Sequence, residues 1–294
     1  MAIPGTPPEL LIFVAFFWCR TCLPEGLLAE ILPPLHQRDV RRFTLHTVLA
    51  CGPTLRPEIR WPDKQEKDRI VERCRDMIDT RFIPAYTVVD GTETRVTRGY
   101  PKPPTGFGPA PESNEYSVKK KQHSACWPLI VPADGKGLLW AGDPTFNHSD
   151  QAAFNKGARY LYENDPSLGV LMDGGYWPNP KEIVDSHRER TIIGFKPSRR
   201  NPKKKGMKEK DRPPLTHQQV AENKALSQSR VVVENIFSRC KHWAILRFLP
   251  VKGTDVYKLA FLKALLDFLL PLVHRSLVAS PPRKVNWKHP NNTQ

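Results

Sequence analysis

Two short apolar runs, each ending in an aspartate followed by glycine, constrain the fold of this chain most strongly. The first is Thr87-Val88-Val89-Asp90-Gly91, and the second is Val170-Leu171-Met172-Asp173-Gly174. Apolar and β-branched runs of this length, stopped by a turn, are typical of buried strands. A third acid, Glu234, instead lies inside a long helical pattern. The alternation of strand and helix signals around these acids predicts an α/β fold.

The 294 residues suffice for one large domain or two small ones, and they divide into three predicted parts. Residues 1–80 form a helical N-terminal region, residues 85–250 an α/β domain, and residues 251–294 a C-terminal helix with a polar tail. Thr216 and Gln219 have the spacing of a capping box, which predicts the start of a helix. The patterns predict helices at about 62–80, 150–163, 216–240 and 256–273, strands at 85–89, 116–126, 127–141, 168–172 and 191–195, and a turn at 134–137.

The chain is strongly basic, with 45 Lys and Arg against 30 Asp and Glu, a net charge of +15 and a sequence pI of about 9.7. Such an excess favours a polyanionic partner, nucleic acid before an anionic membrane. The basic segment at 196–215 is predicted to be a disordered loop, with DNA-backbone binding and nuclear import as further roles. The residues that we predict to contact DNA are Lys119, Lys120, Lys121, Lys196, Arg199, Arg200, Lys203, Lys204 and Lys205.

The cysteines and the two apolar segments indicate an intracellular protein that does not span a membrane. The six cysteines are scattered, and Cys19 and Cys22, which form the one close pair, lack a second pair at zinc-ligand spacing. We read them as reduced, mostly buried thiols. The run Leu10–Trp18 is shorter than the roughly 20 residues of a membrane span and lacks the flanks of a signal peptide, so we expect a buried helix. The apolar stretch 256–273 contains charged residues and fits an amphipathic helix.

The three acids have the chemistry of a two-metal phosphodiester site. Magnesium prefers oxygen ligands and keeps several waters, so two or three carboxylates and a substrate phosphate suffice to bind it. Two such ions activate the attacking oxygen and stabilise the leaving oxygen of an in-line displacement. Arg230, one helical turn before Glu234, is placed to bind phosphate or to steady the carboxylate. Asp90, Asp173 and Glu234 lie far apart in the sequence, so only the fold can bring them together.

Five stretches in a fixed order resemble the DDE nuclease domain of PIF/Harbinger-type transposases and the related bacterial insertion-sequence transposases. Val88-Val89-Asp90-Gly91-Thr92, Leu171-Met172-Asp173-Gly174-Gly175-Tyr176 and Arg230-Val231-Val232-Val233-Glu234 match the settings of the three acids. Tyr116-Ser117-Val118-Lys119-Lys120-Lys121-Gln122-His123 resembles the lysine-rich strand of the family, and Ile59-Arg60-Trp61-Pro62 resembles its lead-in.

The resemblance implies an RNase H-like mixed sheet flanked by helices, with Asp90, Asp173 and Glu234 as catalytic metal ligands. The implied cofactor is Mg²⁺, with Mn²⁺ as a substitute, and the implied reaction is DNA nicking followed by attack of the freed 3′-hydroxyl on target DNA. A nuclear location, a separate Myb-like DNA-binding protein and a homo-oligomer are further expectations from the family.

Two positions depart from the family pattern. The family usually has His followed directly by Asp before the middle helix, whereas here Ser149 separates His148 from Asp150. These two residues are candidates for a supporting role beside the metal ligands, although Asp150 fits equally well as a helix cap. In the N-terminal region, Asp39–His46 resembles only a remnant of a helix-turn-helix. The rival hypotheses are a catalytically inactive or domesticated transposase that binds DNA or protein, and a nuclease of the same fold that acts on RNA.

Overall fold

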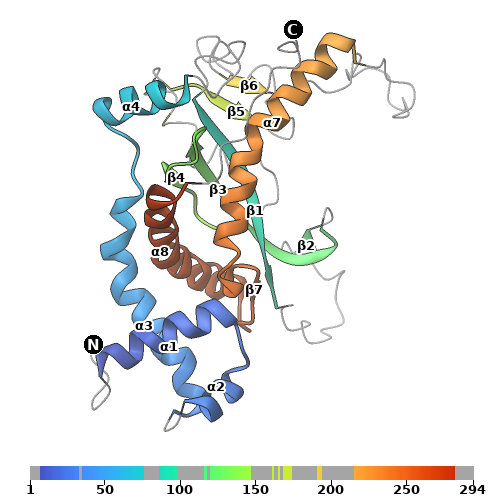
Figure 1. Cartoon of the computed structure of the whole chain (residues 1–294). Helices are drawn as coiled ribbons and strands as arrows, with labels where there is room; N and C mark the ends of the chain where they lie inside the picture. Colours follow the sequence, from blue (N-terminus) through green and yellow to red (C-terminus); the bar gives the residue numbers. More distant parts are fainter. Residues whose placement is uncertain are drawn as a thin grey trace.

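A mixed sheet forms the centre of the computed structural model (Figure 1). The structure describes residues 7–32, 35–75, 86–97, 116–117, 120–146, 161, 165, 168–173, 191–193 and 215–281. Seven strands in these ranges belong to the sheet: β1 (Thr87–Val96), β2 (Tyr116–Ser117), β3 (Gln122–Pro132), β4 (Trp140–Ala141), β5 (Val170–Met172), β6 (Thr191–Ile193) and β7 (Phe248–Leu249).

The sheet is mixed, because it contains both antiparallel and parallel strand pairs. β3 pairs antiparallel with β1, and β4 pairs antiparallel with β3 on its other side. On the opposite side of β1, β5 runs parallel to it and β6 runs parallel to β5. The order β4-β3-β1-β5-β6 therefore places the long β1 strand in the middle. Short strands extend this path, because β2 pairs with β3 and β7 pairs with the end of β1.

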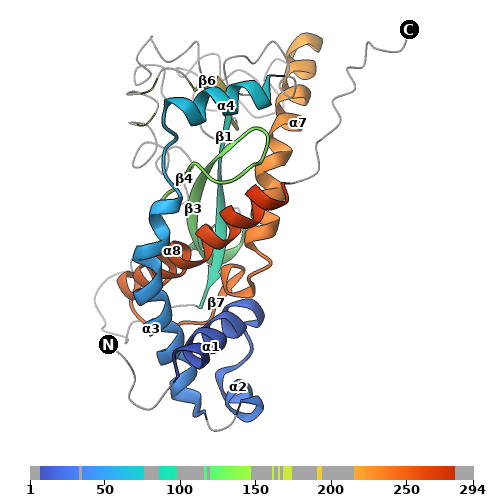
Figure 2. The ribbon, with the colours of Figure 1, turned by 60° about the vertical axis from the view of Figure 1, so that its left-hand side comes forward.

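Helices flank this sheet, and the predicted mixed α/β class is confirmed. In Figures 1 and 2, α7 runs across one face of the sheet and α8 across the other, while α1 and α2 lie toward β7 and α3 runs from there along α8. The buried apolar side chains of these helices and of the sheet form one continuous core. The helical segments are α1 (Pro8–Thr21), α2 (Glu25–Ile31), α3 (Gln37–Leu55), η1 (Arg56–Glu58), α4 (Lys64–Cys74), α7 (His217–Cys240), η6 (Ala244–Leu246) and α8 (Asp255–Ala279).

Side-chain caps define where the main helices begin. Asp63 accepts a hydrogen bond from the backbone of Glu66 and starts α4. The predicted capping box at Thr216 and Gln219 is present and starts α7, so that prediction is confirmed. Thr254 caps α8 by accepting from the backbone N–H of Tyr257. Each cap satisfies an N–H group that a helix leaves without a partner at its first turn.

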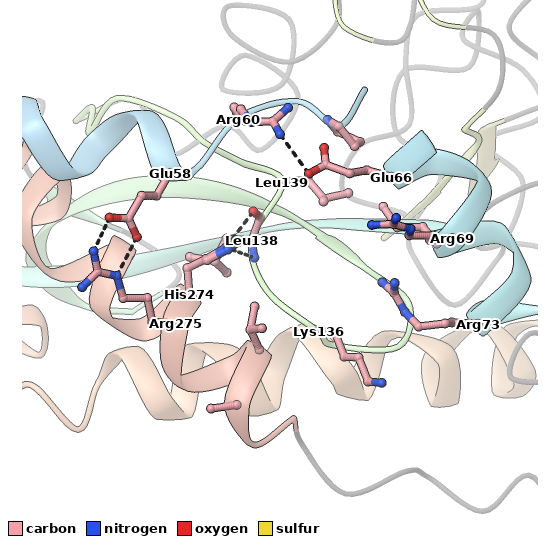
Figure 3. Close-up of a pocket in the computed structure, with 14 residues that line it drawn as sticks. Glu58, Arg60, Glu66, Arg69, Arg73, Lys136, Leu138, Leu139, His274 and Arg275 are labelled. Atoms are coloured by element: carbon pink, nitrogen blue, oxygen red, sulfur yellow. Dashed lines mark hydrogen bonds and ion pairs between the residues drawn. The ribbon is translucent and has the colours of Figure 1, made fainter. Parts of the chain in front are cut away.

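The turn between β3 and β4 rests against α8. Gly135 and Gly137 have φ angles of 70° and 104°, which favour glycine, and the predicted turn at 134–137 is confirmed. The backbone N–H of Leu138 donates to His274 Nδ1 over 3.0 Å (Figure 3). A Cβ on Gly137 would lie 2.9 Å from His274 Cε1, so only glycine lets the turn approach the imidazole this closely.

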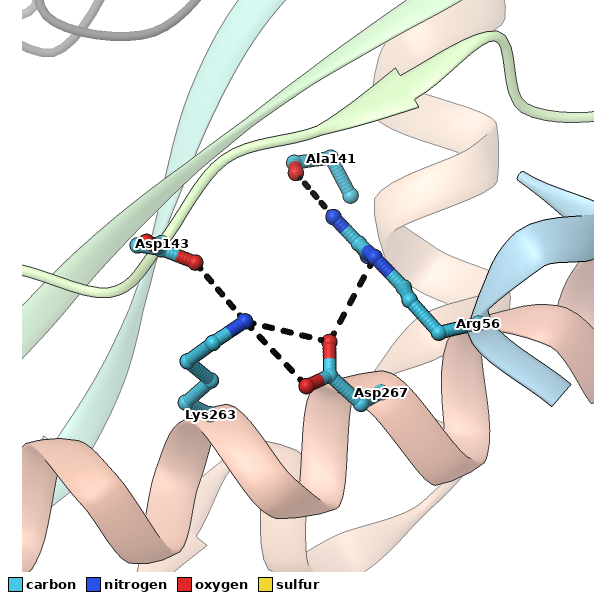
Figure 4. Close-up of polar contacts among 5 residues, drawn as sticks. All are labelled: Arg56, Ala141, Asp143, Lys263 and Asp267. Carbon is cyan, nitrogen blue, oxygen red and sulfur yellow. Dashed lines mark hydrogen bonds and ion pairs between the residues drawn. The ribbon is translucent and has the colours of Figure 1, made fainter. Parts of the chain in front are cut away.

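A network of charged side chains joins α3, η1 and α8 to the end of β4 (Figure 4). Asp267 on α8 pairs with Arg56 over 3.4 Å and with Lys263 over 3.1 Å. Lys263 also pairs with Asp143 over 2.9 Å. Burial alone lowers the pKa of Lys263, but hydrogen bonds from its ammonium to Asp143 and Asp267 raise it above the usual value. Where α3 crosses α8, a Cβ on Gly52 would lie 3.4 Å from Asp267 Cβ, so the two helices are in close contact.

Three predicted boundaries are wrong. The strand predicted at 85–89 runs on to Val96, because Thr92, Thr94 and Val96 continue the buried alternation, the first two pairing with β3 and Val96 with β7. The strands predicted at 116–126 and 127–141 do not meet at 126, since β3 runs without a break from Gln122 to Pro132. α8 extends beyond the predicted 256–273 to Ala279. The helix predicted at 150–163 lies outside the described residues except for Leu161, which is helical.

The cysteines and the apolar run near the N-terminus behave as predicted. All six cysteines are free thiols, and four of them are buried. α1 contains the run Leu10–Trp18 and buries Val14, Ala15 and Trp18, although Phe13 is half exposed. Among the described helices, none combines the length and the apolar character that a membrane crossing requires.

Candidate active site

The register of β1 and β5 brings two of the three predicted acids side by side. Thr87 pairs with Val170 and Val88 pairs with Leu171 in the parallel ladder. Asp90 lies two residues after Val88, and Asp173 lies two residues after Leu171. The two aspartates therefore occupy equivalent positions along two neighbouring segments of the sheet. β5 ends at Met172 while β1 continues, which leaves Asp173 just past a strand end and Asp90 within a strand. The prediction that Asp90 ends its strand is therefore wrong.

Arg230 of α7 holds both aspartates. Its Nη2 donates to Asp90 Oδ2 over 2.9 Å, and its Nη1 lies 3.3 Å from Asp173 Oδ1. The exposed fraction of the side chain is 12% for Arg230, 19% for Asp90 and 50% for Asp173. Arg230 Nε is buried and has no hydrogen-bond partner in the described part of the structure. A single guanidinium thus bridges two carboxylates that would otherwise repel each other and offsets half of their combined charge.

The packing of α7 on the sheet explains why Arg230 points inward. Val233, Ile236 and Phe237 are buried on the same helix, and Phe237 packs edge-on against Trp127 of β3 with ring centroids 5.8 Å apart. Arg230 follows the buried Ser229 and lies at the margin of this apolar stripe. We expected Arg230 to steady the carboxylate of Glu234 or to bind phosphate. In the structure it contacts the other two predicted ligands instead.

Glu234 lies apart from the two aspartates. Its side chain is exposed on α7 and makes no ion pair with any residue that the structure describes. Within the described ranges, no group of three or more His, Cys, Asp or Glu side chains is placed to hold a metal ion. The structure therefore assembles two of the predicted ligands around Arg230 and leaves the third one helical turn away from that arginine.

Two of the predicted DNA-binding lysines lie in a hairpin turn. Lys120 and Lys121 connect β2 to β3, both are exposed, and Lys121 has a φ of 52°. These two lysines lie within the strand predicted at 116–126, but in the structure the chain reverses direction here. The turn lies near the end of α7, where burial, together with the charge of Lys120, lowers the pKa of Lys241 below its usual value. Basic side chains therefore gather beside the C-terminal end of the helix that carries Arg230 and Glu234.

The remaining predicted site residues lie outside the described residues. These are His148 and Asp150 beside the metal ligands, and Lys119, Lys196, Arg199, Arg200, Lys203, Lys204 and Lys205 as DNA contacts.

The sequence analysis did not identify Asp165, a buried aspartate that precedes Asp173 by eight residues in the sequence. Asp165 accepts a hydrogen bond from Trp61 Nε1 over 2.7 Å and pairs with Lys67 of α4. These contacts tie α4 to the segment that leads into β5, the strand that ends beside Asp173. The local sequence around Asp165 carries no motif. The signal that pointed here was Trp61, within the family-like stretch before α4.

Comparison with known proteins gives the family. The model of the DDE superfamily endonucleases matches residues 89–267, which is more than half of the chain. This chain belongs to the DDE superfamily endonucleases. The matched range contains Asp90, Asp173 and Glu234, together with most of β1 and all of β5 and α7, which carry or precede them.

Other comparisons add little about this DDE superfamily endonuclease. No curated protein matches the chain significantly. A solved structure titled "Crystal structure of a pre-cleavage Mos1 transpososome" is similar at 11% identity and a TM-score of 0.18, with 96% of this chain and 82% of that chain covered. A TM-score this low does not bear on the fold.

The donor set at Asp90 and Asp173 fits a hard divalent cation. Both groups are carboxylates, and both already face one positive charge at hydrogen-bonding distance. Magnesium accepts one or two protein carboxylates and fills its other positions with water and phosphate oxygens. The guanidinium of Arg230 stands where such a cation would be coordinated, so that cation and the arginine compete for the same oxygens. DDE endonucleases generally use divalent metals, and this pair of residues suits that chemistry.

Proposed function

We propose that this DDE superfamily endonuclease is a PIF/Harbinger-type transposase that nicks DNA and transfers the freed 3′-hydroxyl end to target DNA. The observation that carries the proposal is the adjacency of Asp90 and Asp173 on neighbouring parallel strands around one cationic group. Two carboxylates fixed by a sheet register are a rigid support, and rigid supports hold reacting groups in a productive geometry.

In this proposal Asp90 and Asp173 hold the divalent metal, Mg²⁺ or Mn²⁺, and Glu234 completes the ligand set. When bound, the metal supplies charge stabilisation to the attacking and leaving oxygens of the phosphodiester. Asp90 is fixed by β1, whose next residue, Gly91, donates its N–H to Asp90 Oδ1 over 2.9 Å. This bond orients the carboxylate and leaves its second oxygen directed at Arg230.

Arg230 has two roles in the proposed reaction. Without metal and DNA it bridges the aspartates, and in the loaded site its five N–H donors are free to hold a phosphate of the substrate. The exposed position of Glu234 leaves its carboxylate accessible from solvent.

DNA is the proposed substrate, and the positive charge of the chain supports it. We propose that Lys120 and Lys121, exposed in the β2–β3 turn, contact the phosphate backbone, together with the predicted basic residues between 196 and 205. A nuclear location, a Myb-like DNA-binding partner and a homo-oligomer belong to the same proposal and rest on the family resemblance.

Metal-dependent nicking by site variants tests the proposal. We expect supercoiled plasmid DNA to be nicked by the wild type with Mg²⁺ or Mn²⁺, and nicking to fall at least 100-fold in Asp90→Asn, Asp173→Asn and Glu234→Gln. Asp68→Asn is the matched control, because Asp68 is exposed on α4 and makes no ion pair with the described residues. Retention of cleavage in all three site variants would overturn the proposed mechanism.

The alternative function is that of a catalytically inactive or domesticated transposase that binds DNA or a partner protein. The exposed Glu234, outside any three-ligand group of described residues, favours this alternative. It predicts that the wild type binds DNA as tightly as the triple variant and that neither cuts it. A parallel cleavage assay on RNA of the same sequence distinguishes the DNA-cutting transposase and the inactive transposase from a nuclease that cuts RNA.

A further inference from the structure

A pocket lies on the side of the sheet away from α7, between α4, the β3–β4 turn and the C-terminal end of α8 (Figure 3). Its volume of about 610 Å³ lies within the range of ligand-binding pockets. α7, which carries Arg230 and Glu234, does not line it. The pocket is therefore separate from the candidate active site and needs its own explanation.

Three cations gather along one side of this pocket. Arg69 and Arg73 lie one turn apart on α4, and Lys136 projects from the β3–β4 turn (Figure 3). Arg73 uses its Nε to donate to Asp134, which leaves its Nη groups available. Arg69 and Lys136 make no ion pair with any residue in the described ranges.

The two carboxylates that line the pocket each have an arginine partner, and Glu66 lies one turn before Arg69 on α4. Arg60 pairs with Glu66 over 2.9 Å, and Arg275 makes a two-pronged pair with Glu58. Hydrogen bonds from Arg275 lower the pKa of Glu58 below its usual value, so that carboxylate stays charged. Both carboxylates are offset by their arginine partners, so the uncompensated charge at the pocket is positive and favours an acidic ligand.

Apolar side chains line the space between these charged groups. Ile70, Leu138 and Leu139 are buried, and Val278 of α8 is 56% exposed at the pocket edge. The hydrogen bond between Leu138 and His274 holds the turn in place, so this apolar surface is formed before any ligand arrives. A DNA backbone gains little from an apolar surface, whereas a peptide inserts apolar side chains into one.

We propose that this pocket binds a peptide segment of a partner protein in which acidic and apolar side chains alternate. The acids pair with Arg69, Arg73 and Lys136, and the apolar side chains pack on the exposed Val278 at the pocket edge. Because Arg69 and Lys136 make no ion pair with any described residue, charge complementarity commits the site to an acidic partner. This inference goes beyond the proposed nuclease function and does not depend on it.

Binding of designed peptide libraries to the full-length protein tests the proposal. The probe is a library of 12-residue peptides in which Asp or Glu alternates with Leu or Phe. A matched library replaces Asp and Glu with Lys and Arg, and a third peptide contains Glu and Gly alone. We expect the protein to enrich peptides from the first library only, and the best of them, labelled with fluorescein, to give a saturable anisotropy change.

Substitutions in the pocket test whether the labelled peptide binds there. Arg69→Glu combined with Lys136→Glu should weaken the labelled peptide at least tenfold, and Val278→Ser should weaken it about threefold. Lys64→Glu is the matched control on the same helix, because Lys64 is exposed and does not line the pocket, and it should leave affinity unchanged.

Three outcomes would overturn the proposal. The first is equal enrichment of all libraries, and the second is peptide binding that the double variant leaves intact. The third is a double variant that loses affinity for a 20-base-pair DNA duplex more than Lys64→Glu does, which would assign the cations to DNA. Circular dichroism of each variant verifies that the fold is retained. Because nicking activity is not a readout here, failure of the proposed nuclease function leaves the result unaffected.

Discussion

Replacement of Arg230 by methionine should destabilise the protein in the absence of metal. The substitution keeps a long side chain but removes the positive charge and the donors that hold Asp90 and Asp173. Loss of one partner from a buried ion pair costs about 3–5 kcal/mol, because the remaining charge stays buried without compensation. Asp173 is half exposed and recovers solvation, so its share is strongly screened. The expected loss is therefore about 2 kcal/mol, smaller than for a fully buried pair.

Two comparisons sharpen this prediction. Arg230→Lys keeps the charge but cannot hold two carboxylates with one planar group, so it should lose roughly 1 kcal/mol. Lys224→Met lies on the same helix, is exposed and makes no ion pair with the described residues, so its free energy of unfolding should change by less than about 0.5 kcal/mol.

Urea unfolding in EDTA and again in Mg²⁺ measures the effect. A ligand that binds only the folded state stabilises it by RT ln(1 + [L]/Kd), about 1.4 kcal/mol at ten times Kd. Because Arg230 competes with a cation for the same oxygens, Mg²⁺ should stabilise Arg230→Met more than the wild type. Equal stability of the two proteins in EDTA would refute the idea that Arg230 offsets the charge of the aspartates. A larger Mg²⁺ effect in the wild type would refute the competition.

Two further predictions concern α8. Asp267→Asn breaks the pairs with Arg56 and Lys263 and should reduce the free energy of unfolding by about 1–2 kcal/mol, against no measurable change in Asp68→Asn. Burial lowers the pKa of His274 below its usual 6.5. The unfolded state therefore binds a proton more readily, and the stability from this group is complete above pH 6.5 and is lost as the pH falls below it. Urea titrations between pH 7.5 and 5.5 should show a steeper decline in the wild type than in His274→Gln.

The strands and helices that were predictable share a strong local signal. The run before Asp173 is apolar on both faces, as a central parallel strand requires, and Thr216 with Gln219 carries its own cap. The end of β1 was not predictable from local signals, because Asp90-Gly91 resembles a turn while pairing with β3 keeps the chain extended. The hairpin at Lys120 was missed for a related reason, since a lysine with positive φ leaves no mark in a sequence.

In the candidate site too, one part was predictable from local sequence and another part was not. The pairing of Asp90 with Asp173 follows from strand register, which the hydrophobic pattern specifies strongly in a buried sheet. The phase of α7 is a weaker constraint, because Arg230 and Glu234 differ by four residues, or about 40° of rotation and about 6 Å along the axis. Either side chain can therefore lie nearest the aspartates with a small shift of the helix. The sequence identified both residues, but only tertiary packing decides which one meets the carboxylates, and in this structure the arginine does.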